Sequence, residues 1–161
     1  MIRYALVGLL AVLMADVASA EPPPDVAVPA GAHDLGTNAL KGLSADQIDK
    51  IFNNYGHEVV VCMAFFNVVK EAFRRADPNH PGITNVDRSV AVLSERALSL
   101  QDQDVVLARF KIAMREMTEK MQGTFDRFSI IFGEYGLACQ EVREDPIARL
   151  VHWRKELYPG Q

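Results

Sequence analysis

Apolar residues recur at steps of three and four positions along most of the chain, which is the period of one face of an α-helix. The first run lies between Ser44 and Asp77. Its apolar positions are Ile48, Ile51, Phe52, Tyr55, Val59, Cys62, Phe66, Val69 and Phe73. Ser44 and Gln47 have the spacing of a capping box at its start. Asp77 precedes Pro78, and a residue before proline is disfavoured in helical conformation, so we expect the helix to end there.

The centre of this first helix is apolar on every side between Val59 and Val69, apart from Asn67. A helix that is apolar all round is normally buried on several sides, so we expect this helix to be central. Asn67 then has two interpretations. It fixes the helix register through one buried hydrogen bond, which we favour, or it lines a ligand cavity.

Two further helical patterns follow a turn at residues 77–82, whose residues are of turn-forming types. The second helix has one apolar face at Val86, Val90, Leu93, Ala97 and Leu100, and the polar residues 99–104 predict its end. The third pattern is the longest, with Phe110, Met114, Met117, Met121, Phe125, Phe128, Phe132, Tyr135 and Cys139. Asp145 and Pro146 then open a short last helix, since proline suits the first helical position.

The third pattern is compatible with two arrangements at Gly123 and Thr124. Either one helix continues to about Val142 as a spine of roughly 60 Å, or glycine ends one helix and threonine caps the next. The unbroken phase of the stripe favours the spine, and the all-round apolar segment of the first helix favours a compact bundle or a dimer. The predicted fold is thus all-α, a bundle of three long helices with a short C-terminal helix, the third helix being broken near Gly123 in one arrangement.

The first twenty residues have the features of a signal peptide. Arg3 gives a positive start, Ala5 to Ala15 is unbroken and apolar, and Ala18-Ser19-Ala20 has small residues where a signal peptidase cuts. The alternative is a membrane anchor, but the run is shorter than the ~20 residues of a bilayer span. We expect a signal peptide at 1–20, a Pro/Gly-rich extended or disordered arm at 21–43, and a helical domain at 44–161.

Export bears on the expected oxidation state of the two cysteines, Cys62 and Cys139. A cysteine pair in an exported chain usually forms a disulfide, whereas free thiols are the rule in the cytosol. The alternative is two buried thiols that act as small apolar residues. A bridge between them would close a long loop and stabilise the fold by roughly 4 to 5 kcal/mol in the chain-entropy model.

Charge and motifs restrict the function further. A net charge of −4 gives no electrostatic footprint for nucleic acid. The sequence has no phosphate loop, no nucleophile elbow, no HExxH and no CxxC, so we expect no cofactor and no enzymatic activity. In an antiparallel packing around the bridge, His57 and Glu58 would come near Glu141 and Glu144, a grouping that could hold a metal ion, but a solvated charged rim is favoured.

The methionines allow one more alternative. Met114, Met117 and Met121 could offer thioethers to copper or, with His152, axial ligands to a haem. Methionine at helical spacing beside phenylalanine is far more often core packing, which we favour.

Three segments carry a resemblance to other proteins. They are Cys62-Met63-Ala64-Phe65-Phe66, the segment from Tyr135 to Cys139, and Asp145-Pro146-Ile147-Ala148-Arg149 before Trp153. Together they resemble small exported bacterial helical proteins of uncharacterised function. The resemblance implies two cysteines and a helical bundle, and it implies no catalytic residues.

We therefore expect an exported protein of the periplasm or cell exterior, with no membrane span after removal of the signal peptide. It would act as a structural or protein-interaction module with an unknown protein partner, or as a homodimer. The alternative is a carrier of a small ligand, haem or metal in a bundle cavity near Asn67.

Overall fold

The computed structural model describes residues 39–160, which form helices and connecting loops without a β-strand. The predicted all-α fold is therefore confirmed for this part of the chain. Its elements are α3 (Ala45–Ala76), α4 (Gly82–Leu100), α5 (Gln103–Lys120), the 3-10 helix η1 (Phe125–Arg127), α6 (Phe128–Glu144) and α7 (Pro146–Leu157). The predicted signal peptide at 1–20, and residues 21–38 of the predicted arm, lie outside the described residues.

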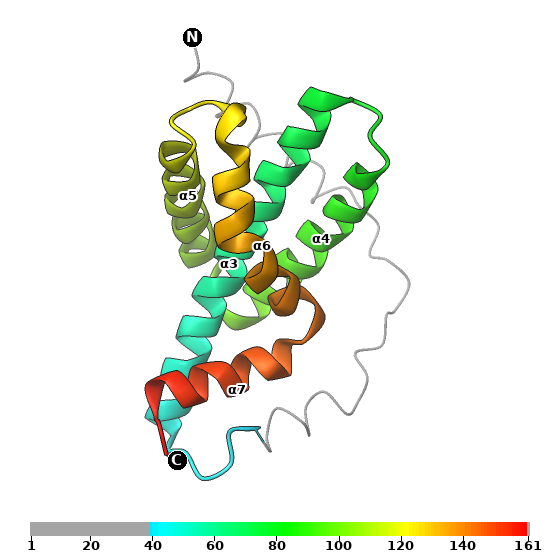
Figure 1. Cartoon of the computed structure of the whole chain (residues 1–161). Helices are drawn as coiled ribbons and strands as arrows, with labels where there is room; N and C mark the ends of the chain where they lie inside the picture. Colours follow the sequence, from blue (N-terminus) through cyan, green and yellow to red (C-terminus); the bar gives the residue numbers. More distant parts are fainter. Residues whose placement is uncertain (1–38, 161) are drawn as a thin grey trace. The chain divides into compact units, whose positions relative to one another are not determined.

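Helix α3 is the centre of this helical unit, and each of the other α-helices contacts it. Figure 1 shows α3 running through the middle, with α4 on one side and α5 and α6 on the other, while α7 crosses its first half. The segment predicted to be apolar all round is buried in this position. Its buried residues are Val59, Val60, Cys62, Met63, Ala64, Phe65, Asn67, Val68 and Val69.

Local side-chain chemistry sets the helix ends. At the start of α3, the Ser44 hydroxyl accepts a hydrogen bond from the Gln47 amide, and the Gln47 side chain accepts one from the Ser44 amide. This is the predicted capping box. At the start of α7, the Asp145 carboxylate accepts a hydrogen bond from the Ala148 amide, and Pro146 occupies the first helical position. Both sequence signals therefore correspond to real helix starts.

The long third pattern is broken at residues 121–124, so the structure has the turned arrangement and not the continuous spine. Gln122 and Gly123 have φ angles of 53° and 73°, which no helix interior can accommodate. The Gly123 amide donates to the Thr118 carbonyl, which closes the end of α5. The chain then reverses, and α6 begins beside the end of α3, where the Arg75 guanidinium lies 4.2 Å from the centre of the Phe125 ring.

The last residues of the predicted arm are packed against the helices. Leu40 is buried, and the Ala39 carbonyl accepts a hydrogen bond of 2.7 Å from Arg154 on α7. Ordered packing thus begins before Ser44, within the stretch assigned to the arm.

Alanine substitutions at Gly123 and Gly133 test the break between α5 and α6. Replacing Gly123 with alanine should lower the free energy of unfolding by about 1 kcal/mol, because a Cβ is strained at its positive φ. Gly133 lies inside α6, and no atom lies within 4 Å of the place a Cβ would take. Gly133→Ala should therefore stabilise the protein by up to about 1 kcal/mol. Urea denaturation at low protein concentration measures both, and a shift of the same sign in the two variants would contradict the turn.

Candidate functional site

The two cysteines join the central helix to α6. Cys62 and Cys139 are bonded to each other, with 5.1 Å between their Cα atoms, and each side chain is 1% exposed. This is the predicted pair. Because α6 begins at the end of α3 and its last half lies level with Cys62, the two helices run antiparallel, as Figure 1 shows. The bridge is sealed from solvent, so it is a structural crosslink.

A hydrogen-bonded ion pair holds α7 against α3, one helical turn before Cys62 in α3. Arg149 donates to both carboxylate oxygens of Glu58, and the Trp153 indole donates to the same carboxylate at 2.8 Å. The Arg149 and Glu58 side chains are only 12% and 15% exposed. A carboxylate with three donors around it is held in place, so Glu58 acts as an anchor for α7.

The acidic residues of the possible metal site have other partners. Glu58 bonds to Arg149 and Trp153, and Glu141 also bonds to Arg149. Glu144 pairs with Arg143, and His57 is exposed on α3. Within residues 39–160, no group of three or more histidine, cysteine or acidic side chains could hold a metal ion. The carboxylates of this rim serve as ion-pair partners.

Of the three possible methionine ligands, Met114 is half-buried and the other two belong to the interior, as does Asn67. Met117 and Met121 are buried at the inner side of the α5 end. The Asn67 amide is buried too, and it donates to the Met63 carbonyl one turn earlier in the same helix at 2.9 Å. The predicted hydrogen bond of Asn67 therefore exists, but it stays within α3 and does not fix a partner helix. More than three turns earlier in α3, burial raises the pKa of the Tyr55 phenol, although the Arg96 guanidinium acts in the opposite direction.

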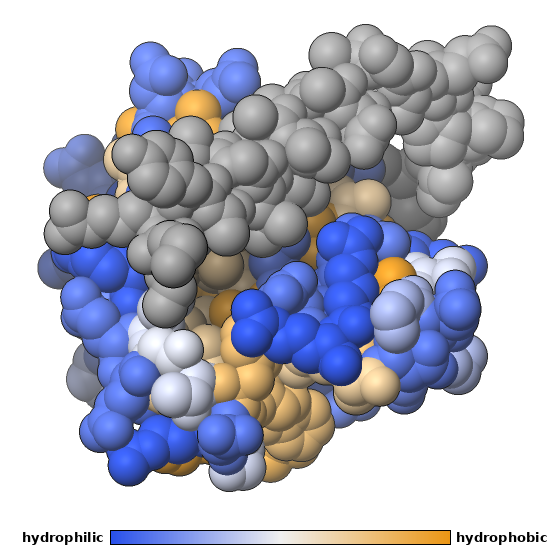
Figure 2. All heavy atoms as spheres, turned by 90° about the horizontal axis from the view of Figure 1, so that it is seen from above, coloured by the Kyte–Doolittle hydropathy of each residue, from blue (hydrophilic) through white to orange (hydrophobic). Residues whose placement is uncertain are grey.

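The most unusual surface lies on the outer side of α6. Leu137 is 81% exposed, Phe132 57% and Ile130 46%. Ile130, Gly133 and Leu137 follow one another at spacings of three and four, so they share one line along the helix. We call these three residues the α6 outer face. Figure 2, the view from above, shows that the surface of the protein includes an exposed hydrophobic area with hydrophilic residues beside it.

The apolar stripe that contains Cys139 does not predict this face. Phe132 belongs to that stripe, yet more than half of its side chain is exposed. The available signal was a second apolar line on the same helix, at Ile130 and Leu137, out of phase with the first. Contiguous exposed apolar surface on a folded domain often marks a contact surface, so we take the α6 outer face as the candidate functional site.

Known proteins give no further guidance on this site. Comparison with models of protein families, with curated protein sequences and with solved structures finds no match to this chain. The resemblance to small exported helical proteins therefore stays a prediction, and the function has to be argued from the chain itself.

The disulfide should supply a large part of the stability. With the cysteines 77 positions apart in the sequence, the chain-entropy model assigns the bridge about 4.5 kcal/mol. Removal of native disulfides typically costs 2 to 5 kcal/mol. We expect a loss in this range when the protein is reduced, measured by urea denaturation of the oxidised and reduced forms. Two alkylatable thiols in the protein before reduction would refute the bridge.

The ion pair of Glu58 with Arg149 should contribute more to the free energy of unfolding than an ion pair on the surface does. Glu58→Ala leaves the Arg149 charge buried with less compensation, so unfolding should become easier by about 3 kcal/mol. The same variant removes the acceptor of Trp153, the single tryptophan of the chain, so its fluorescence should report altered packing of α7. Glu71→Ala is the matched control, because its pair with Arg75 is largely exposed and should contribute less than about 1 kcal/mol. Equal losses in the two variants would contradict the anchor.

Proposed function

We propose that this chain is an exported helical protein-interaction module, crosslinked by a disulfide, that self-associates through the α6 outer face. The observation that carries the proposal is the 81% exposure of Leu137, the most exposed large apolar side chain in the described part of the chain. Burying an exposed leucine side chain gains about 1.5 to 3 kcal/mol of free energy. A partner that covers this side chain would provide that gain.

The shape of the α6 outer face favours a second copy as that partner. Gly133 leaves open space over the helix backbone, since a Cβ there would meet no atom within 4 Å. Leu137 projects one turn further along the same line. If two α6 helices lie antiparallel across a two-fold axis, each Leu137 sits over the Gly133 of the other copy, because residues i and j contact each other reciprocally. Small residues allow such close helix approach.

Charge modulates this pairing without preventing it. In the antiparallel register, Asp126 of one copy faces Glu144 of the other. These carboxylates lie nine residues from the centre of the contact, about 13 Å along the helix. They face each other at the two ends of the contact, and because both are exposed, salt screens their repulsion. Glu144 is also paired with Arg143. We therefore expect the association to strengthen as salt is added.

Two features support export, the sequence of the first twenty residues and the disulfide. The sequence of residues 1–20 has the order of regions found in signal peptides. The disulfide between Cys62 and Cys139 fits an oxidising compartment. None of the helices in residues 39–160 is long and apolar enough to cross a bilayer.

Size-exclusion chromatography with light scattering tests self-association on the oxidised protein. We expect twice the chain mass at micromolar concentration, and a monomer for Leu137→Glu, since the new carboxylate would have to be buried against Gly133. The matched control is Leu98→Glu, because Leu98 is also an exposed leucine, at 49%, but lies on α4. A monomeric native protein, or equal loss of the dimer in both variants, would contradict the proposal.

A further inference from the structure

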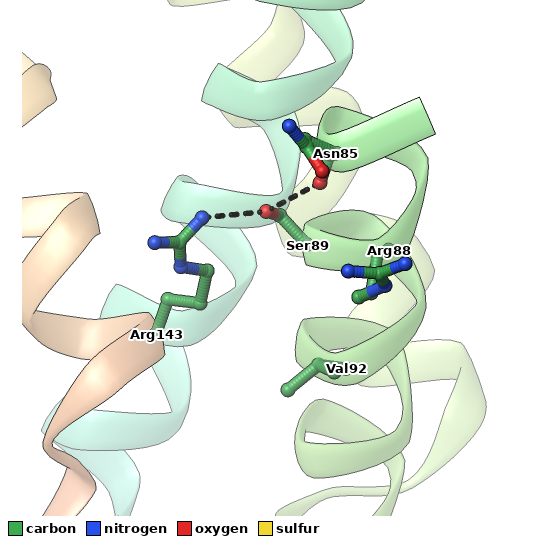
Figure 3. Close-up of a pocket in the computed structure, with 5 residues that line it drawn as sticks. All are labelled: Asn85, Arg88, Ser89, Val92 and Arg143. Carbon is green, nitrogen blue, oxygen red and sulfur yellow. Dashed lines mark hydrogen bonds between the residues drawn. The ribbon is translucent and has the colours of Figure 1, made fainter. Parts of the chain in front are cut away.

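A hollow of about 440 Å³ lies between α4 and α6, away from the α6 outer face. Its lining residues are Asn85, Arg88, Ser89 and Val92 from α4 and Arg143 from α6. Figure 3 shows Arg143 reaching across from α6 to Ser89, with Val92 pointing to the same side. The volume falls in the range of small-molecule sites, about 300 to 1,000 Å³. We call this hollow the α4–α6 groove.

Hydrogen bonds hold the Arg143 guanidinium at the groove. Ser89 is 2% exposed, and its hydroxyl accepts from Arg143 at 3.1 Å while donating to the Asn85 carbonyl at 2.9 Å. The Phe66 ring lies under the same guanidinium, with 5.9 Å from the ring centre to the Arg143 Cζ atom, which is within cation–π range. Arg143 is thus positioned by buried or half-buried groups.

Both arginines keep hydrogen-bond donors available. A guanidinium carries five N–H donors. In the described structure, Arg143 donates only to Ser89 and Glu144, and no hydrogen bond or ion pair engages the exposed Arg88. Asp87, the acid next to Arg88 in sequence, is already paired with Lys70. The groove lining has two arginines and no carboxylate. The charge of Arg143 is balanced by its pair with Glu144, so the uncompensated positive charge at the groove is that of Arg88.

We propose that the α4–α6 groove binds the carboxylate of a small amphipathic acid. The planar guanidinium of arginine matches a carboxylate in a two-pronged geometry. Arg143 and Arg88 would hold the acid group from the two walls. The apolar part of the ligand would lie against Val92, which is 39% exposed beside them. This site uses other residues than the α6 outer face and is independent of the proposed self-association.

Nuclear magnetic resonance titration of the oxidised protein tests the groove, with hexanoate, acetate and inorganic phosphate as probes. Hexanoate should shift the amide signals of Ser89, Val92 and Arg143 in a saturable way. Acetate should bind more weakly, because it has only a methyl group to place against Val92. Binding of phosphate as tight as that of hexanoate would overturn the assignment to an amphipathic acid, and shifts outside the groove would overturn the site.

Substitutions of single arginines distinguish specific binding by the groove arginines from a general effect of the protein's charge. Arg88→Gln should weaken hexanoate binding about tenfold, since one charge-assisted hydrogen bond is lost. Among residues 39–160, Arg88 makes no hydrogen bond or ion pair that this variant would remove. Arg143→Gln should weaken binding at least as much. Arg115→Gln on α5 is the control, because Arg115 is an exposed arginine that does not line the groove, and it should leave the affinity unchanged. Unchanged affinity in Arg88→Gln would refute the proposal.

Discussion

The whole arrangement depends on the burial of α3 on all sides. A helix whose middle, from Val59 to Val69, is apolar on every side apart from Asn67 cannot be covered by one partner, so several helices have to surround it. The chain supplies them in sequence order: α4 packs back along α3, the hairpin of α5 and α6 covers another side, and α7 crosses the first half. The other helices make few contacts with one another by comparison. Their amphipathic patterns follow from this single requirement, because each has only to match one side of α3.

The ion pair of Glu58 and the disulfide of Cys62 fix how two helices are positioned along α3, which burial of apolar residues alone does not specify. Apolar contact is non-directional, so it leaves helices free to slide or rotate against α3. The Cys62–Cys139 disulfide fixes the position of α6 along α3. The ion pair between Arg149 and Glu58 fixes the position of α7, one helical turn earlier in α3. The two act by different physics: the bond restricts the unfolded chain, whereas the ion pair is strong only where water is excluded. Together they set the register at one level of the central helix.

Local patterns predicted each helix, but not every connection. Ser44, Asp145 and Pro146 mark helix starts through contacts within a few residues, which is why the sequence alone locates them. The break at Gly123 was undecided, because α5 and α6 both face α3 and their stripes keep one phase across the turn. A periodicity analysis cannot detect a reversal that preserves phase. The pairing of Glu58 with Arg149 spans 91 residues and had no local signal.

The same reasoning explains why α6 stands out. A surface helix needs one apolar side, and α6 has it in Ile131, Cys139 and Val142, all buried towards α3. Ile130 and Leu137 add a second apolar side that the fold does not use. Gly133 lowers the helix propensity of α6 by about 1 kcal/mol relative to alanine and fills no internal space. Residues that cost stability without serving the core are explained by a contact outside it, and the close approach of a second helix is the contact that a glycine permits.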